Sequence, residues 1–365
     1  MELLKKLYSI YSGSRNELPM REFIKEWVGE NVACATIVED ETGNIMVTKG
    51  ESESYPCLAS HTDQVQRPYP DDYEVMQMHD VAKQQTSFHA TSWSRYKETG
   101  NSVRCGLGAD DKNGIWVALR CLEKYDVLKC AFFVGEEIGC YGSKQVDMSW
   151  FDDCRWVAQI DRRGATDFIT DICGRLCSDE FILDAIDDGR FGRVPMRGAM
   201  TDTMTLRDRG LKVSSCNMSC GYYNPHTEEE YTVWEELVNT LLFVEHLIED
   251  LTDVYELNRD VTRVGWDFQR GIDTLCNVSF GIPRHTSIHE QQEEEVEILC
   301  YDVIEEIFDE NAQDSIDVDE LAKYLYDKNG KQFGYVPLKF YKETIEQVFE
   351  EFAESEAYFG MCEEE

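Results

Sequence analysis

The N-terminal part of the chain shows two helical patterns of apolar positions followed by two extended ones. Residues Glu2–Tyr11 and Met20–Val28 carry apolar side chains at helical spacing, and the breaker sequence Ser12-Gly13-Ser14 separates them. The β-rich runs Val32–Val38 and Ile45–Thr48 then flank a turn-forming cluster of polar residues and glycine. The pattern predicts two amphipathic helices followed by a β-hairpin.

Further along the chain, four short apolar runs stop abruptly at a polar residue. They are Pro56–Ser60 before His61, Cys130–Val134 before Gly135-Glu136-Glu137, Trp156–Ile160 before Asp161, and the weaker run Lys212–Ser215. Such runs fit buried strands, and the helix-like segment Gly114–Tyr125 lies among them. The alternation predicts an α/β fold. In such folds ligands collect beyond the carboxyl ends of the strands, where His61, Glu136 and Asp161 are expected.

A strong helical pattern between Thr232 and Leu251 closes this region, and Thr232-Val233-Trp234-Glu235 has the form of a capping box. The sequence therefore predicts a catalytic domain at 1–253, a connector with little periodicity at 254–285, and a mainly helical region at 286–365. This last region holds 24 acidic residues against five lysines. Its expected helices lie near Glu294–Phe308, Asp319–Tyr326 and Phe340–Phe352.

The chain carries a formal net charge of −37, which argues against nucleic acid or an anionic membrane as a partner. Neither a signal-type apolar core nor a run of about 20 apolar residues is present. The fourteen cysteines are read as reduced thiols, so a cytoplasmic location is expected. Two C-x3-C pairs, Cys173/Cys177 and Cys216/Cys220, leave a structural zinc open as an alternative, but buried thiols are favoured.

Several acids and histidines stand directly after apolar runs or in glycine-rich turns. They are His61 and Asp63 in Ala59-Ser60-His61-Thr62-Asp63, Asp110 in Gly108-Ala109-Asp110-Asp111-Lys112, the pair Glu136-Glu137, Asp161, and His226 in Asn224-Pro225-His226-Thr227. Each alone has an ordinary alternative, such as a surface histidine, a turn cap or a solvated acid. A two-metal hydrolase needs a bridging carboxylate, terminal ligands and a free carboxylate that handles protons. The set supplies each of these parts once, so it predicts a two-metal site.

These motifs resemble those of the co-catalytic zinc exopeptidases, the superfamily that contains tripeptide aminopeptidase (peptidase T), carboxypeptidase G and the single-domain zinc aminopeptidases. The matches are His-Thr-Asp at 61–63, Gly-Ala-Asp-Asp-Lys-x-Gly at 108–114, Gly-Glu-Glu-Ile-Gly-x-x-Gly-Ser at 135–143, Asp161, and Pro-His-Thr at 225–227. The resemblance covers residues 1–251. It implies a mixed, mostly parallel central sheet flanked by helices, to which the acidic helical C-terminal region is an extension.

The resemblance also implies roles for individual residues. Five would be metal ligands: Asp110 as the bridge, His61 and Asp161 at one metal, and Glu137 and His226 at the other. Two would act in other ways, Asp63 by orienting His61 and Glu136 as the general base that takes a proton from a metal-bound water. The two divalent ions would be zinc, with cobalt or manganese as alternatives. The bond between Asp110 and Asp111 is expected to be cis.

The spacing of the motifs limits what can be carried over about the substrate. Many relatives insert a lid or dimerisation domain between the fourth and fifth ligands, but only 64 residues separate Asp161 from His226 here. The 48 residues between His61 and Asp110 leave room for at most a small insertion. Because carboxylate recognition in the lidded relatives uses that domain, an aminopeptidase acting on short peptides is favoured.

Alternatives to this activity stay open. They are a carboxypeptidase, an amidohydrolase acting on N-acyl amino acids, and an inactive metal-binding interaction protein. Arg197 and Asp202 are candidates for binding substrate, against an ordinary loop. The sequence predicts no oligomeric state.

The acidic region contains one further motif. Asp309–Glu320 places oxygen-bearing side chains at the positions that bind calcium in an EF-hand loop. The sixth position is Asp314, where the turn of such a loop requires glycine. An acidic connection between helices is therefore favoured over a calcium site.

Overall fold

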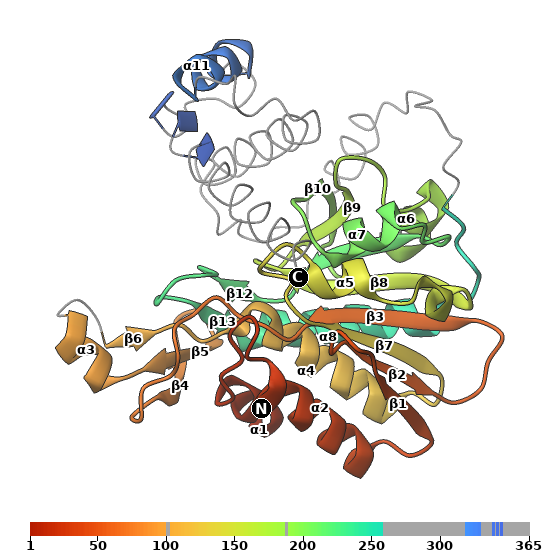
Figure 1. The fold of residues 1–365 in the computed structure, drawn as a ribbon, viewed down its shortest axis with the longest axis horizontal. Coiled ribbons are helices and arrows are strands. Elements are labelled where there is room, and N and C mark those ends of the chain that lie inside the picture. The colour runs from red at the N-terminus through yellow and green to blue at the C-terminus, as the bar shows by residue number, and fades with distance from the viewer. Residues whose placement is uncertain are drawn as a thin grey trace, which may run out of the picture. The chain divides into compact units, whose positions relative to one another are not determined.

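The computed structural model describes residues 1–99, 103–186, 189–257 and 318–329, together with a few residues between 338 and 345. The chain divides into two compact units, Met1–Asn258 and Arg259–Glu365. The first unit contains every element discussed below except the last helix (Figure 1). In the second unit, α11 (Val318–Asn329) includes the predicted helix Asp319–Tyr326. The predicted helix Glu294–Phe308 and the greater part of the calcium motif lie outside the described residues. So does most of the predicted helix Phe340–Phe352, of which residues 341, 342, 344 and 345 are described and are helical.

The first unit is built on an eight-stranded mixed sheet in the order β1-β2-β7-β3-β8-β11-β9-β10. The four neighbouring strands β7, β3, β8 and β11 are parallel to one another. The strand bounds are β1 Ala35–Glu39, β2 Ile45–Lys49, β3 Tyr55–His61, β7 Leu128–Phe133, β8 Cys154–Arg162, β9 Asp167–Asp171, β10 Val194–Arg197 and β11 Ser215–Ser219. The predicted hairpin is confirmed, because β1 and β2 pair antiparallel. So is the mixed, mostly parallel sheet.

Alternate residues of the central strands enter two different hydrophobic cores. In β3, Leu58 belongs to one core, whereas Cys57 and Ala59 belong to the other. Because side chains alternate across a strand, both faces of the sheet must be covered by helices. Figure 1 shows α4 (Ala109–Lys124) on one side of β3 and β8 and α7 (Asp202–Asp208) on the other.

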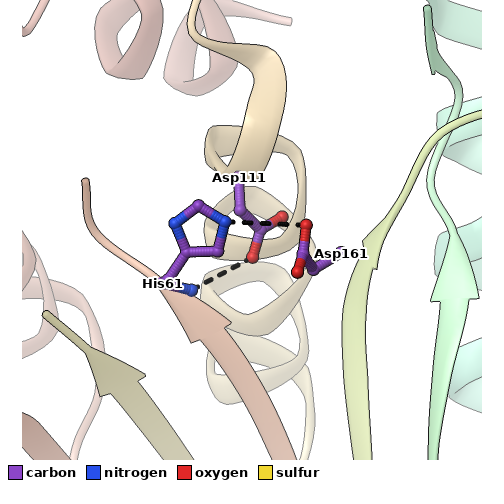
Figure 2. A group of neighbouring side chains, drawn as sticks. All are labelled: His61, Asp111 and Asp161. Carbon is purple, nitrogen blue, oxygen red and sulfur yellow. Dashed lines mark hydrogen bonds and ion pairs between the residues drawn. The ribbon is translucent and has the colours of Figure 1, made fainter. Parts of the chain in front are cut away.

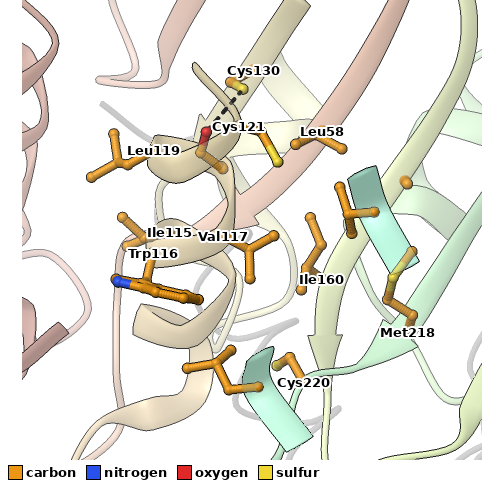
Figure 3. Close-up of a cluster of buried hydrophobic side chains, with 14 of the residues drawn as sticks. Leu58, Ile115, Trp116, Val117, Leu119, Cys121, Cys130, Ile160, Met218 and Cys220 are labelled. Carbon is orange, nitrogen blue, oxygen red and sulfur yellow. Dashed lines mark hydrogen bonds between the residues drawn. The ribbon is translucent and has the colours of Figure 1, made fainter. Parts of the chain in front are cut away.

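Helix α4 lies very close to the sheet (Figure 3). Its residues Ile115, Val117 and Leu119 are fully buried. Gly114 permits the approach, because a Cβ atom there would lie 2.4 Å from the carbonyl oxygen of Ile160 in β8. The amino end of α4, which carries the aspartates of the glycine-rich motif, is thereby fixed against the end of β8.

Three of the remaining helices agree with the predicted ones within a few residues: α1 Glu2–Tyr8, α2 Leu18–Asn31 and α8 Trp234–Asp250. The sequence did not predict α3 Trp93–Thr99, α5 Tyr141–Gln145 and α6 Asp179–Ile186, nor the 3-10 turn η1 at Met148–Phe151. The capping box predicted at Thr232 is wrong. Thr232 lies in a strand, and its hydroxyl oxygen instead accepts hydrogen bonds from Tyr8 Oη at 2.8 Å and Asn113 Nδ2 at 3.1 Å.

A second, five-stranded sheet was not predicted from the sequence. Its order is β12-β13-β5-β4, with β6 paired to β5. The strands are β4 Glu74–Asp80, β5 Gln85–Thr91, β6 Arg104–Cys105, β12 Tyr222–Tyr223 and β13 Tyr231–Val233. Strand β4 is exposed over nearly all its length, so no burial pattern marked it. The strand predicted at Lys212–Ser215 in fact begins at Ser215, as β11 Ser215–Ser219. Its buried residues are both polar and apolar, so no continuous apolar run marked its position.

Candidate metal centre

The central parallel strands place three of the predicted residues at one edge of the sheet. His61 is the last residue of β3, and Asp161 is the second-last of β8, which is its neighbour. Figure 2 shows the His61 ring directed toward Asp161, and the distance from Nε2 to Asp161 Oδ1 is 3.6 Å. Glu136 and Glu137 follow β7, the neighbour of β3 on its other side. The predicted position at the carboxyl ends of the strands is therefore correct.

Asp110 reaches the same edge from the glycine-rich turn that begins α4. Gly108 has φ of +64°, and a Cβ atom there would lie 2.8 Å from both Gln64 Oε1 and Lys112 Nζ. Glycine is therefore needed for both its backbone conformation and its close packing. The peptide bond between Asp110 and Asp111 is cis, as the resemblance implied.

His226 comes from the second sheet rather than from the main one. It lies in the loop between β12 and β13, which pair antiparallel, and its backbone φ is +62°. Such a conformation is uncommon for a residue other than glycine and is frequent at functional sites. The side chain is 53% exposed, whereas the other four predicted ligands are largely buried.

The structure brings all five predicted ligands together in two groups that share Asp110. One oxygen of Asp110 lies 3.1 Å from His61 Nε2, and the other lies 3.3 Å from His226 Nε2. His226 Nε2 also lies 3.0 Å from Glu137 Oε2. Two ligand atoms bound to one tetrahedral zinc at about 2.1 Å lie about 3.4 Å apart. The spacing of these side chains therefore fits two metals on either side of Asp110.

The chemistry of the group also fits a metal. Glu137 Oε1 is buried and makes no hydrogen bond within the described part of the protein. Burial, together with the neighbouring charge of Asp110, raises the pKa of Glu137 to about 7. Burial and Asp110 likewise raise the pKa of Asp161 to about 6. Buried carboxylates gathered without cations are costly, and a divalent ion between them removes that cost.

Asp63 touches both the histidine ligand and the glutamate pair. Its Oδ1 lies 3.3 Å from His61 Nδ1 and accepts a hydrogen bond of 3.0 Å from the backbone N–H of Glu136. Its Oδ2 accepts a hydrogen bond of 3.3 Å from the backbone N–H of Glu137. The predicted orientation of His61 by Asp63 is thus geometrically possible, and the same carboxylate fixes the backbone of the two glutamates.

Asp111 could compete with Asp110 as a ligand, because it forms a potential metal-binding group with His61 and Asp161. Its two oxygens, however, accept hydrogen bonds from the backbone N–H of His61 at 3.1 Å and of Gly114 at 2.9 Å. Figure 2 shows the first of these bonds. The Asp111 carboxylate therefore holds the strand end and the helix start together, whereas the oxygens of Asp110 face the two histidines.

Sequence reasoning missed Glu230. It is buried near the start of β13 and accepts hydrogen bonds from the backbone N–H of Asp110 at 3.2 Å and from Gln66 Nε2 at 3.0 Å. Its carboxylate also accepts a hydrogen bond from the backbone N–H of Gly108. Glu230 thus joins the loop that carries His226 to the turn that carries Asp110. Only its position, four residues after His226, could have suggested it.

Of the two residues predicted to bind substrate, Arg197 lies apart from this group, whereas Asp202 is linked to Asp161 through the side chain of Gln159. Arg197 is on edge strand β10, its side chain is 71% exposed, and it lies 3.8 Å from Asp171. Two strands separate β10 from β8, which corresponds to about 14 Å between them. Asp202 is fully buried, and its carboxylate accepts hydrogen bonds from Ser143 Oγ and Gln159 Nε2. Neither position favours direct contact with a substrate at the metals.

The burial of Asp202 predicts a pH dependence of stability. Burial raises its pKa from 3.8 to about 7, so between these values the folded protein holds a proton that the unfolded chain has released. The stabilisation by this group is present below about pH 4 and is lost as the pH rises to about 7. We expect the unfolding free energy of the wild type, relative to Asp202→Asn, to fall over this window by at most about 1.4 kcal/mol per pH unit.

Urea unfolding of the chelator-treated protein at several pH values measures this difference. Asp208→Asn, at the exposed end of the same helix, serves as the surface control. A difference between the wild type and Asp202→Asn that stays constant from about pH 4 to 7 would contradict the prediction.

Comparison with solved structures identifies the fold. The chain is similar to aminopeptidase PepT from Bacillus cereus, with 14% identity over 68% of this chain and 96% of that one and a TM-score of 0.51. A tripeptidase from Staphylococcus aureus gives 14% identity over the same shares and a TM-score of 0.53. An aminopeptidase from Desulfurococcus kamchatkensis gives 19% identity over 68% and 94%, with a TM-score of 0.50. The chain has an aminopeptidase-like fold. No protein-family model and no curated protein matches its sequence.

The residues in both long intervals between the motifs form strands and helices of the two sheets. The residues between Asp161 and His226 supply β9 to β12 with α6 and α7, and β9, β10 and β11 belong to the main sheet. The residues between His61 and Asp110 supply β4, β5, β6 and α3. The small insertion thus becomes most of the second sheet. Among the described helices, none has the length and apolar character needed to cross a bilayer.

Proposed function

We propose that this protein is a metal-dependent hydrolase that cleaves an amide bond of short peptides, acting as an aminopeptidase with two zinc ions. The observation that carries the proposal is the position of Asp110, each of whose oxygens lies within 3.3 Å of a different histidine. Asp161 completes one group and Glu137 the other. Imidazole and carboxylate ligands suit zinc and also admit cobalt or manganese.

Glu136 is the residue that we assign to proton transfer. Metals bound here would supply an acidic water and stabilise the negative charge that develops on the scissile carbonyl oxygen. Burial raises the pKa of Glu136 well above its usual value, which favours a carboxylate that takes up a proton and gives it to the leaving amine. The backbone N–H of Glu136 donates a hydrogen bond to Asp63, which fixes the position of the Glu136 backbone and so restricts where its side chain can lie.

Three observations favour short peptides and a free amino terminus. The similar solved structures include proteins described as aminopeptidases and as a tripeptidase. The interval in which lidded relatives carry their extra domain is used here for the main sheet. The net charge of −37 also favours an amine-bearing substrate over an anionic one. The cysteines of the described region are not joined in disulfides, which supports a reducing, cytoplasmic compartment.

Metal analysis combined with a substrate panel tests the proposal. We expect two metals per chain and hydrolysis of amino-acyl anilides that have a free amino group. N-acetylation of the substrate should abolish hydrolysis, and a chelator should abolish it until zinc is restored. Hydrolysis that requires a free carboxylate would instead identify a carboxypeptidase or an N-acyl amino-acid amidohydrolase. Metal binding without hydrolysis of any substrate would identify a metal-binding interaction protein.

A further inference from the structure

We propose that Ser14 is a positioning residue that holds Asp63 and, through it, the metal ligand His61 and the glutamate pair. Ser14 lies in the short segment between α1 and α2, far from every motif of the site in sequence. Its hydroxyl donates a hydrogen bond of 2.8 Å to Asp63 Oδ2. This inference rests on the proposed function, because that function makes His61 a metal ligand. The hydrogen bond between Ser14 and Asp63 is observed independently of it.

The segment that carries Ser14 is fixed along the end of β3. Gly13 forms a parallel β-bridge with Gln64, which directly follows Asp63. The backbone N–H and the hydroxyl of Ser12 both lie 3.4 Å from Gln64 Oε1. At the other end of the segment, Tyr8 Oη lies 2.5 Å from Asn113 Oδ1 in α4. Ser14 is therefore presented to Asp63 by a restrained backbone rather than by a chance surface contact.

The surroundings of Asp63 explain why one hydroxyl matters. A carboxylate has about four lone-pair positions. Three are used by hydrogen bonds from the backbone N–H groups of Glu136 and Glu137 and from the Ser14 hydroxyl, and Oδ1 also lies 3.3 Å from His61 Nδ1. The Asp63 side chain has no exposed surface, so water cannot readily replace a lost donor. Without the hydroxyl, Asp63 Oδ2 keeps only the longer bond of 3.3 Å to Glu137.

Loss of the hydroxyl should therefore loosen His61 and the backbone of the glutamate pair together. The His61 ring would lose part of the restraint that aims Nε2 at Asp110 and Asp161. Residues that orient metal ligands affect metal affinity and turnover by about ten- to a hundredfold, and Ser14 acts one contact further out. We expect about a fivefold to tenfold weaker zinc affinity and a similar fall in kcat, with KM nearly unchanged.

The test compares Ser14→Thr with Ser14→Val in the full-length protein, because these side chains have the same shape and differ in the hydroxyl. Zinc affinity is measured by competition with a chromophoric chelator, and the geometry of the site by the visible absorption of the cobalt-loaded protein. We expect Ser14→Val to weaken zinc binding and alter the cobalt spectrum, and Ser14→Thr to resemble the wild type. Ser9→Ala is the matched control, since the Ser9 hydroxyl, at the end of α1, donates a hydrogen bond to the Lys6 carbonyl of that helix and not to the site.

Equal zinc affinities and equal cobalt spectra for the Thr and Val variants would overturn the proposal. The same holds if Ser9→Ala weakens zinc binding as much as Ser14→Val does. The metal measurements need no substrate. If the wild type binds two metals but hydrolyses no peptide, the proposed function fails while the role of Ser14 is still decided.

Discussion

Replacement of Glu136 by glutamine should leave two metals bound and lower kcat by about a hundredfold to ten-thousandfold. The amide has nearly the shape of the carboxylate but cannot accept a proton from the attacking water. In the assignment proposed here Glu136 is not a ligand, because Asp110 and Glu137 provide the carboxylate oxygens near His226. The backbone N–H of Glu136 keeps its bond to Asp63 in this variant, so the site should remain assembled. Metal analysis and steady-state kinetics of the same preparation measure the two effects.

The adjacent residue provides the sharpest control for this prediction. Glu137→Gln removes the negative charge from a side chain whose oxygen lies 3.0 Å from His226 Nε2. It should therefore reduce metal content as well as activity. If Glu136→Gln also loses metal, Glu136 is a ligand and the proposed division of roles is wrong. If it keeps full activity, another group takes the proton.

Replacement of Asp110 by asparagine should have the largest effect on metal binding. Asp110 alone directs an oxygen at each histidine, at 3.1 Å and 3.3 Å, so its charge is shared by both sites. We expect the variant to bind at most one metal and to lose activity by more than about a thousandfold, because a two-metal reaction needs both ions. Isothermal titration with zinc gives the stoichiometry directly.

Two other Asp→Asn variants serve as controls for this result. Asp126→Asn, whose side chain is 103% exposed just after α4, should bind two metals and retain full activity. Asp111→Asn replaces one of the two oxygens that accept from the backbone N–H groups of His61 and Gly114, so it should lower stability more than the number of metals bound. Two tightly bound metals in Asp110→Asn would sink the bridging assignment. If Asp111→Asn loses one metal and Asp110→Asn does not, Asp111 is the bridging residue.

The candidate site also depends on two segments outside the main sheet, the second sheet and the segment between α1 and α2. Glu230 ties the loop of His226 to the turn of Asp110, and Ser14 ties the start of the chain to Asp63. Both contacts join parts of the chain that no motif connects. A substitution in either segment can therefore disturb metal binding without touching a ligand.

The sequence by itself determined the strands that lead to His61 and Asp161, the helix after the glycine-rich turn, and the set of candidate ligands. These features are local, because a buried parallel strand requires a continuous apolar run and a tight turn requires glycine. The same locality made the motifs of 61–63, 108–114 and 135–143 readable without any structure. The candidate site was therefore readable from the order of these short segments.

Tertiary structure alone decided how these segments meet. The second sheet escaped prediction because β4 is exposed over most of its length and carries no alternation of apolar residues. Ser14 and Asp63 are 49 residues apart, and Glu230 and Asp110 are 120 apart, so their hydrogen bonds have no local signal. Burial of Asp202 likewise depends on the packing of α7 against β8 and β11. Polar contacts between distant segments depend on where the backbone places them, and only the folded chain specifies that.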